Sequence, residues 1–282
     1  MPFHPPAPRP AWNLDLPVLI PLAAFGLLYM VGALRAWRRA GRGHGLTLWQ
    51  FARFLGALLA LVIALLSPLD ALSESLFSAH MLQHQILMIV AAPLLSSSGF
   101  SLAFLWALPR PGAQGIAHLV NRYRLLPSVW KRLSHPLSAW FLFGLAQWLW
   151  HASWFYQLAL QHEAVHILEH LSFLLTAMLF WWVLFRPAQD RTRYALAIPY
   201  LFTTSLHSAM LSALITFSSS PWYPFYAARA AAWGLSPLQD QQLAGLLMWI
   251  PGGTVFSLLT IGYFAAWLRA LEQRSAGVAR LK

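Results

Sequence analysis

The chain has 282 residues, of which 59% are hydrophobic and only 10% are charged, and its mean hydropathy is +0.56. Soluble domains carry about 25% charged residues, so this composition excludes an ordinary water-soluble protein. The sequence contains no cysteine, which excludes disulfides, iron–sulfur clusters and thiolate metal sites. Any metal bound here must be held through nitrogen, oxygen or thioether sulfur.

Seven apolar stretches approach the ~20 residues that a membrane-spanning helix needs. We expect these spans at about 17–36, 48–69, 79–99, 137–155, 164–185, 195–217 and 241–268. A shorter apolar piece, Phe100 to Leu108, either extends the third span past a kink at Pro93 or lies in the membrane interface. Pro251 and the two glycines after it predict a kink or a break in the last span. The sequence therefore predicts one all-α membrane domain over residues 1–282, a polytopic bundle of seven transmembrane helices.

The basic residues lie almost entirely on alternate connections between these spans. Seventeen of the 19 Lys and Arg residues fall on the first, third and fifth connections and on the C-terminal tail, and only Arg9 and Arg229 fall elsewhere. Because short cytoplasmic loops are enriched in Lys and Arg, this predicts an outside N-terminus and a cytoplasmic C-terminus. The formal charge of +11 is then a topology signal, and no nucleic-acid partner is expected.

Six of the eleven histidines fall where three predicted spans reach the outer side of the membrane. Two pairs have a four-residue spacing, which places both imidazoles on one face of a helix. The six candidates are His80, His84, His151, His162, His166 and His170. Because histidine at membrane depth is costly without a partner, the convergence favours a metal site over a purely structural polar network.

Other side chains near these histidines are secondary candidates, as ligands or as groups that orient the rings. Met81 lies three residues before His84, and Met88 lies four residues after it. Glu163 and Glu169 are candidates to accept hydrogen bonds from the histidine rings and so orient them, and Glu163 is also a candidate ligand. The secondary candidates are Met81, Met88, Glu163, Glu169, His207, Met210, Asp240 and Met248. Each methionine by itself is more typical of packing, and His207 alone is more typical of a hydrogen bond between helices.

Ligand chemistry favours copper. Imidazole suits zinc, copper, iron and nickel, and thioether sulfur shifts the preference toward Cu(I). Zinc and haem are less favoured, since histidines stacked along one helix suit a compact ion better than the two faces of a haem. No nucleophile–base pair or nucleotide motif stands out, so we expect no enzymatic activity. A copper or proton transporter or channel, and a haem-binding redox membrane protein, remain as alternatives.

Three blocks of the sequence resemble the CtaG-type cytochrome c oxidase assembly proteins. They read HMLQHQILMIVAAPLL (80–95), LAQWLWHASWFYQLALQHEAVHILEHLSFLLTAMLFWWVL (145–184) and DQQLAGLLMWIPGG (240–253). Members of this family are polytopic bacterial membrane proteins implicated in copper supply to haem–copper oxidases. The resemblance covers roughly residues 49–267, and its motif positions are His80, His84, His151, His166, His170, Asp240, Gln241 and Trp249.

The resemblance implies a copper-binding assembly factor in the bacterial inner (cytoplasmic) membrane. Its implied partners are cytochrome c oxidase subunits, periplasmic copper chaperones and the lipid bilayer. A single-span copper chaperone that bears the same name works through cysteines, and this chain has none.

Overall fold

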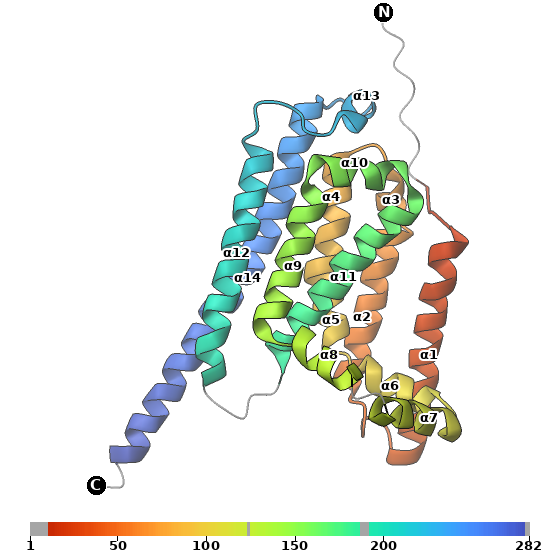
Figure 1. Cartoon of the computed structure of the whole chain (residues 1–282), viewed down its shortest axis with the longest axis vertical. Helices are drawn as coiled ribbons and strands as arrows, with labels where there is room; N and C mark the ends of the chain where they lie inside the picture. The colour runs from red at the N-terminus through yellow and green to blue at the C-terminus, as the bar shows by residue number, and fades with distance from the viewer. Residues whose placement is uncertain (1–10, 123–124, 187–191, 280–282) are drawn as a thin grey trace, which may run out of the picture.

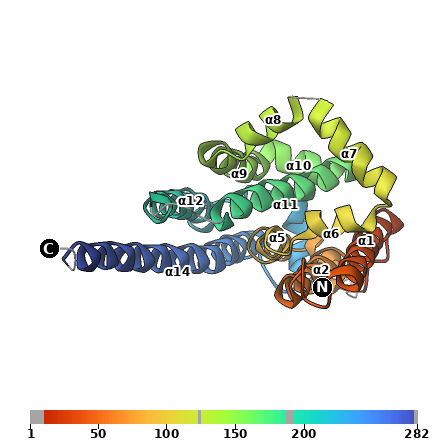
Figure 2. The same ribbon diagram turned by 90° about the horizontal axis from the view of Figure 1, so that it is seen from below.

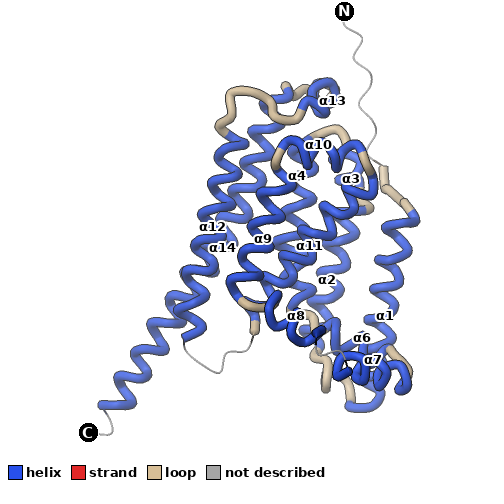
Figure 3. The backbone as a smooth tube through the Cα atoms, viewed as in Figure 1, coloured by secondary structure: helices blue, strands red, loops and turns tan. Residues whose placement is uncertain are grey.

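Helices make up almost all of the described chain, which in this computed structural model comprises residues 11–122, 125–186 and 192–279 (Figure 3). No strand occurs within these ranges. His4 lies outside the described residues. So do five of the basic residues whose distribution predicts the topology: Arg9, Arg124, Arg191, Arg280 and Lys282. The all-helical class predicted from the sequence is confirmed for the described part.

Six helical segments are long and apolar enough to cross a membrane. They are α1 (Leu16–Ala40), α2 (Leu48–Leu65), the continuous segment Phe77–Ser96, α11 (Glu163–Phe185), α12 (Thr192–Thr216) and α14 (Pro237–Ala279). Each coincides with one predicted span, so the chain is a multi-pass membrane protein.

The fourth predicted span, 137–155, corresponds to α9 (Pro136–His151), which has only 16 residues. It ends early because Ala152 adopts extended backbone angles, φ −68° and ψ 128°, and a separate short helix, α10 (Ser153–Gln161), follows. Figure 1 shows α9 running beside α11 within the bundle. A seventh membrane crossing by α9 stays a prediction.

The connections gather at two opposite ends of the bundle (Figure 1). One end carries the start of α1, and also α3 (Pro68–Ser73), α10, a 3-10 turn (Pro224–Tyr226) and α13 (Ala227–Ala231). The other end carries α6 (Phe100–Ala107), α7 (Arg110–Arg122), α8 (Leu125–Leu133) and the end of α14. We call these the α10 end and the α8 end. The predicted outer connections lie at the α10 end and the basic ones at the α8 end, while the side that faces the cytoplasm stays a prediction.

The third membrane segment is irregular just before Pro93. It consists of α4 (Phe77–Gln85), a π-helical turn (Ile86–Ala91) and α5 (Ala92–Ser96). Pro93 has no N–H to donate to the preceding turn, and the indole N–H of Trp181 donates to the Met88 carbonyl at 2.8 Å instead. The disturbance predicted at Pro93 is therefore a π-helical turn satisfied by a neighbouring helix.

The apolar piece after this segment does not extend the span. Gly99 has a left-handed backbone (φ 68°), which a residue with a side chain rarely adopts, and it separates α5 from α6. α6 turns onto α1, where Gly32 lies against the Ala103 carbonyl and Arg35 donates to the Ala107 carbonyl. A side chain at position 32 would push these two helices apart.

Of the kink or break predicted at Pro251, the break is wrong, because α14 continues through this residue without interruption. Membrane helices tolerate proline where neighbouring groups satisfy the freed carbonyls. Here α14 packs closely on α12, with Gly245 against the Ser212 carbonyl. After the proline, the Thr254 hydroxyl donates to the Ile250 carbonyl of the same helix at 2.7 Å.

Candidate metal centre

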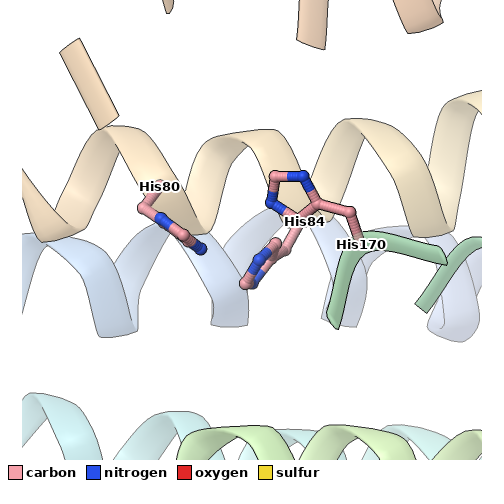
Figure 4. Close-up of side chains that lie close together, drawn as sticks. All are labelled: His80, His84 and His170. Atoms are coloured by element: carbon pink, nitrogen blue, oxygen red, sulfur yellow. The ribbon is translucent and has the colours of Figure 1, made fainter. Parts of the chain in front are cut away.

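Four histidines and one glutamate meet between α4 and α11, toward the α10 end of the bundle. The helical period places His80 and His84 on one face of α4, and His166 and His170 on one face of α11. Figure 4 shows His80 and His84 on α4 with His170 beside them from α11. Glu169 precedes His170 and is completely buried. We call these five residues the His/Glu cluster.

The four imidazole rings are close together. Their centroids are 4.4 Å apart for His80 and His84, and 4.3 Å apart for His166 and His170. Between the two helices, the His80 and His166 rings are 5.2 Å apart, and so are the His84 and His170 rings. Such distances leave room for an ion among the rings but not for a flat macrocycle between them.

The Glu169 carboxylate lies between the two histidines of α4. Its Oε2 is 3.8 Å from Nε2 of His80, and its Oε1 is 3.7 Å from Nε2 of His84. These distances are too long for hydrogen bonds. Since metal–nitrogen and metal–oxygen bonds measure about 2.0–2.2 Å, two ligands of one ion lie roughly 3.3–4.2 Å apart. The carboxylate and the imidazoles are thus spaced like ligands of a common ion.

Two overlapping sets of three groups are compact enough to hold an ion. One is His80, His84 and His170, and the other is His80, His166 and Glu169, with the ligand atoms of each set within 4.8 Å of one another. His80 belongs to both sets. An ion could therefore exchange one set for the other while it keeps one ligand.

The polar atoms of this cluster are buried without hydrogen-bond partners among the described residues. They are Nε2 of His80, both ring nitrogens of His84, Nε2 of His166 and of His170, and both carboxylate oxygens of Glu169. Buried polar groups are nearly always hydrogen-bonded, and each exception costs about 1–3 kcal/mol. One cation would satisfy several of these atoms at once, so the donor set fits a metal ion.

His151 and Met81 lie directly beside the cluster. The His151 ring, at the end of α9, is 6.1 Å from the His84 ring, and both His151 and Met81 are buried. Nδ1 of His151 is 2.6 Å from the Gln147 carbonyl, which can only accept a hydrogen bond. In the neutral ring the Nε2 atom therefore presents a lone pair, and it faces the Met81 sulfur at 3.2 Å. Nitrogen and thioether sulfur facing each other form a ligand pair for a soft ion.

Three tyrosines that the sequence pattern did not reveal lie against this centre. The Tyr156 ring is 5.4 Å from the His80 ring, and its hydroxyl is 2.9 Å from that of Tyr226. The Tyr223 hydroxyl donates to the His151 carbonyl at 2.7 Å. Burial raises the pKa of Tyr223 and of Tyr226, so both hydroxyls stay protonated and able to donate. Because these residues come from connections far apart in the chain, no spacing in the sequence marks them.

Comparison with known families identifies the chain. The family model described as "Cytochrome c oxidase caa3 assembly factor (Caa3_CtaG)" matches residues 27–270, which include every member of the His/Glu cluster. The chain belongs to this family. The resemblance inferred from the three sequence blocks is therefore confirmed.

Curated relatives of this Caa3_CtaG chain occur in mycobacteria. The uncharacterised protein ML1998 of Mycobacterium leprae is 25% identical over 266 residues, which cover 92% of this chain and 40% of the relative. The uncharacterised protein Mb0105 of Mycobacterium bovis is 26% identical over 257 residues, 88% of this chain and 38% of the relative. The chain thus spans about two fifths of the length of these relatives. No solved structure matches.

Asp240, a motif position of the Caa3_CtaG resemblance, lies outside the cluster and supports it. Its carboxylate accepts hydrogen bonds from the backbone N–H groups of Phe77 and Ser78 at 2.7 and 3.1 Å, and from the Ser78 hydroxyl at 2.5 Å. These N–H groups open α4, so Asp240 caps the helix that carries His80 and His84. Its neighbour Gln241 accepts from the Trp222 N–H at 2.6 Å and fixes the connection after α12.

Two candidates at the start of α11 lie apart from the cluster. His162 is exposed and occupies the N-cap position, with φ −131° and ψ 113°, so it precedes the helical turns that carry His166 and His170. Glu163 is exposed in the first helical turn. Both stand at the α10 end of the bundle (Figure 1).

The other secondary candidates contact different parts of the bundle. His207 packs against Trp140 and Gly144, and Met210 is 53% exposed on the same helix. Met88 and Met248 line a small cavity with Gln147, and no histidine occurs among its described lining residues. Trp249, another position of the family resemblance, makes an edge contact with Phe217. The structure brings none of these side chains into the His/Glu cluster.

Proposed function

We propose that this chain binds copper in the His/Glu cluster and supplies it to a cytochrome c oxidase during assembly. The observation that carries the proposal is the burial of seven polar atoms, from five side chains of ligand type, at ligand spacing and without hydrogen-bond partners among the described residues. Family membership supports the oxidase as the client. The cluster would face outward from the bacterial cytoplasmic membrane, where periplasmic copper chaperones could load it.

Ligand chemistry supports copper over zinc. The cluster offers imidazoles and one carboxylate, and the adjacent His151–Met81 pair adds a thioether that zinc does not prefer. The chain has no cysteine. Copper, and Cu(I) in particular, accepts both imidazole and thioether ligands. A copper ion could therefore pass between the His/Glu cluster and the His151–Met81 pair and be bound by suitable ligands throughout.

The positions of the histidines along their helices suggest the direction of loading. His166 lies one turn nearer the start of α11 than His170, and His80 lies one turn nearer the start of α4 than His84, and both helices start at the α10 end (Figure 1). An ion that arrives at the α10 end would first bind at His166, His80 and Glu169. Exchange to His84 and His170 through the shared ligand His80 would then carry it deeper. Overlapping sets of three ligands favour transfer, because no single step strips the ion of all its ligands.

Two other functions agree less well with the structure. A haem would need an open slot between two facing histidines, and the rings here pack at centroid distances of 4.3–5.5 Å. A copper or proton channel would need a polar track to the α8 end. Below the cluster the interior is packed with apolar side chains, among them Phe173, Phe180 and Trp181.

The test is the copper content of the oxidase in a strain that lacks the gene. We expect oxidase subunits and haem to be present but copper to be deficient, and added copper to restore part of the activity. Glu169→Gln and His84→Ala should resemble the deletion while the protein still reaches the membrane. His118→Ala, an exposed histidine on α7, is the matched control and should complement fully.

An oxidase with its full copper content in the deletion strain would contradict the proposal. A fall in cytoplasmic copper, with defects in other copper-dependent processes, would indicate import instead of delivery.

A further inference from the structure

A large cavity lies at the α8 end of the bundle, and no member of the His/Glu cluster lines it. Its volume is about 1360 Å³, and its walls come from α2, α5 and α6 on one side and from α8, α9 and α11 on the other. Figure 2 views the bundle from this end and shows α5 and α6 on one side of α11, with α8 and α9 on the other. The His/Glu cluster lies nearer the other end of α11, and His151 stands at the other end of α9.

The wall of the cavity is mostly apolar and open to the side. It includes Leu94 on α5, Leu142 on α9, and Leu175 and Leu179 on α11. Leu175 is 59% exposed although it lies in the middle of a helix that is long and apolar enough to span a membrane. In a bilayer, hydrocarbon chains and not water would border such a wall.

The rim of the cavity is positively charged. Arg53 on α2 and Arg186 at the end of α11 both line it, and no Asp or Glu occurs among its described lining residues. The Arg53 guanidinium donates to the Ser97 carbonyl at 3.4 Å, and the Arg186 guanidinium lies 3.8 Å from the centre of the Trp182 ring. Guanidinium groups bind phosphate through several parallel N–H donors.

Two tryptophans place this rim at the depth of lipid headgroups. Trp130 on α8 and Trp182 on α11 line the cavity and contact each other, with ring centroids 4.9 Å apart. Tryptophan is enriched where the hydrocarbon region of a membrane meets water. The charged rim, the tryptophans and the apolar wall therefore follow the order of headgroup, interface and acyl chain.

We propose that this cavity binds an anionic phospholipid, with its phosphate at Arg53 and Arg186 and its acyl chains along the leucine wall. Basic pockets between membrane helices on the cytoplasmic side are suited to anionic headgroups, and the distribution of basic residues predicts that the α8 end is cytoplasmic. The lipid would fill the space between α2 and α11, the helix that carries three members of the His/Glu cluster. The proposal is independent of copper binding.

The test is lipid binding by the purified full-length protein, measured by native mass spectrometry. Phosphatidylglycerol should bind more tightly than phosphatidylcholine with the same acyl chains. The double variant Arg53→Gln/Arg186→Gln should weaken phosphatidylglycerol binding by about twentyfold to thirtyfold, given the usual contribution of a basic residue near anionic lipid. The matched control is Arg38→Gln/Arg132→Gln, which removes the same charge from exposed positions at the same end and should change binding by less than about twofold.

Three results would overturn the proposal: equal binding of phosphatidylcholine, equal weakening by the control variant, or displacement of the lipid by millimolar inorganic phosphate. Equal binding of phosphatidylcholine would indicate a purely apolar groove. Equal weakening by the control variant would indicate general attraction of anionic lipid to the basic surface, and displacement by phosphate would indicate a site for a free anion. If the arginine variant does not fold, Leu175→Trp/Leu179→Trp provides a second test. This variant keeps both arginines but places two large side chains where the acyl chains would lie, so it should abolish lipid binding. Unchanged binding would also overturn the proposal.

Discussion

The imidazole of His151 faces the thioether of Met81, with Nε2 3.2 Å from the sulfur. The two side chains are 2% and 0% exposed, and Nδ1 of the ring is committed to the Gln147 carbonyl. Two electron-pair donors in contact inside a protein gain nothing from each other, whereas a soft cation bound by both would stabilise the arrangement. This pair extends the His/Glu cluster toward α9.

Substitution of Met81 by leucine should separate copper from zinc binding. The change conserves volume and should cost less than about 1.5 kcal/mol of folding stability. Loss of the thioether should weaken Cu(I) binding by about tenfold or more and leave Zn(II) binding unchanged. Competition with a chromophoric Cu(I) chelator measures the affinity for Cu(I), and a zinc titration measures the affinity for Zn(II). Met210→Leu, at a half-exposed methionine, is the control; equal losses of both metals in Met81→Leu would indicate a packing defect.

Removal of the Asp240 carboxylate should destabilise the protein through α4. Asp240→Ala would leave the Phe77 and Ser78 N–H groups buried without an acceptor, at a cost of about 1–3 kcal/mol. Asp15→Ala provides the control, because Asp15 occupies the N-cap position of α1 but its side chain makes no capping hydrogen bond. Thermal unfolding in detergent should show a lower Tm for Asp240→Ala alone. Similar Tm values for the two variants would refute the capping role.

The close approach of α12 and α14 depends on Gly245. A Cβ at this position would come within 2.9 Å of both the Ser212 carbonyl oxygen and the Thr216 backbone nitrogen. Gly245→Ala should therefore force the helices apart and cost about 1–3 kcal/mol. Gly262→Ala, on the same helix but with open space around it, should be neutral or slightly stabilising. The difference in Tm between the two variants measures the contact, and no difference would show that the helices can separate without cost.

The predicted orientation can be tested with single introduced cysteines, because the chain has none of its own. Ser219→Cys, in the connection after α12, and Ser153→Cys, at the start of α10, are exposed at the α10 end. Both should react in intact cells with an impermeant thiol reagent. Ser128→Cys, exposed on α8, should react only after the membrane is opened. The reverse pattern would place the His/Glu cluster on the cytoplasmic side.

The sequence predicted the histidine pairs well because a helix converts spacing into direction. Once the third and fifth apolar stretches are helices, the four-residue spacing fixes the face that carries His80 with His84 and His166 with His170. Glu169 was only a secondary candidate, since its distance to the α4 histidines depends on how closely α4 and α11 pack. No local pattern carries that information.

Other features could not be predicted because they depend on contacts between distant segments. Asp240 caps a helix that starts 163 residues earlier in the chain. Likewise, the early end of α9 at His151 and the continuity of α14 through Pro251 follow from packing and not from local propensity. The lengths of the apolar stretches predicted six of the membrane helices closely. The thickness of the membrane sets the length of each spanning helix independently of its neighbours.

The most direct test of copper binding in the His/Glu cluster is metal analysis of the protein purified without a histidine tag from copper-replete cells. We expect at least one copper per chain, with nitrogen and oxygen ligands at about 2.0 Å by X-ray absorption. His84→Ala and Glu169→Gln should each lower bound copper, and the double variant should lose little more than the worse single variant, because both groups complete one coordination sphere. His118→Ala should retain its copper. Wild-type protein without copper, or full copper in the double variant, would contradict the account.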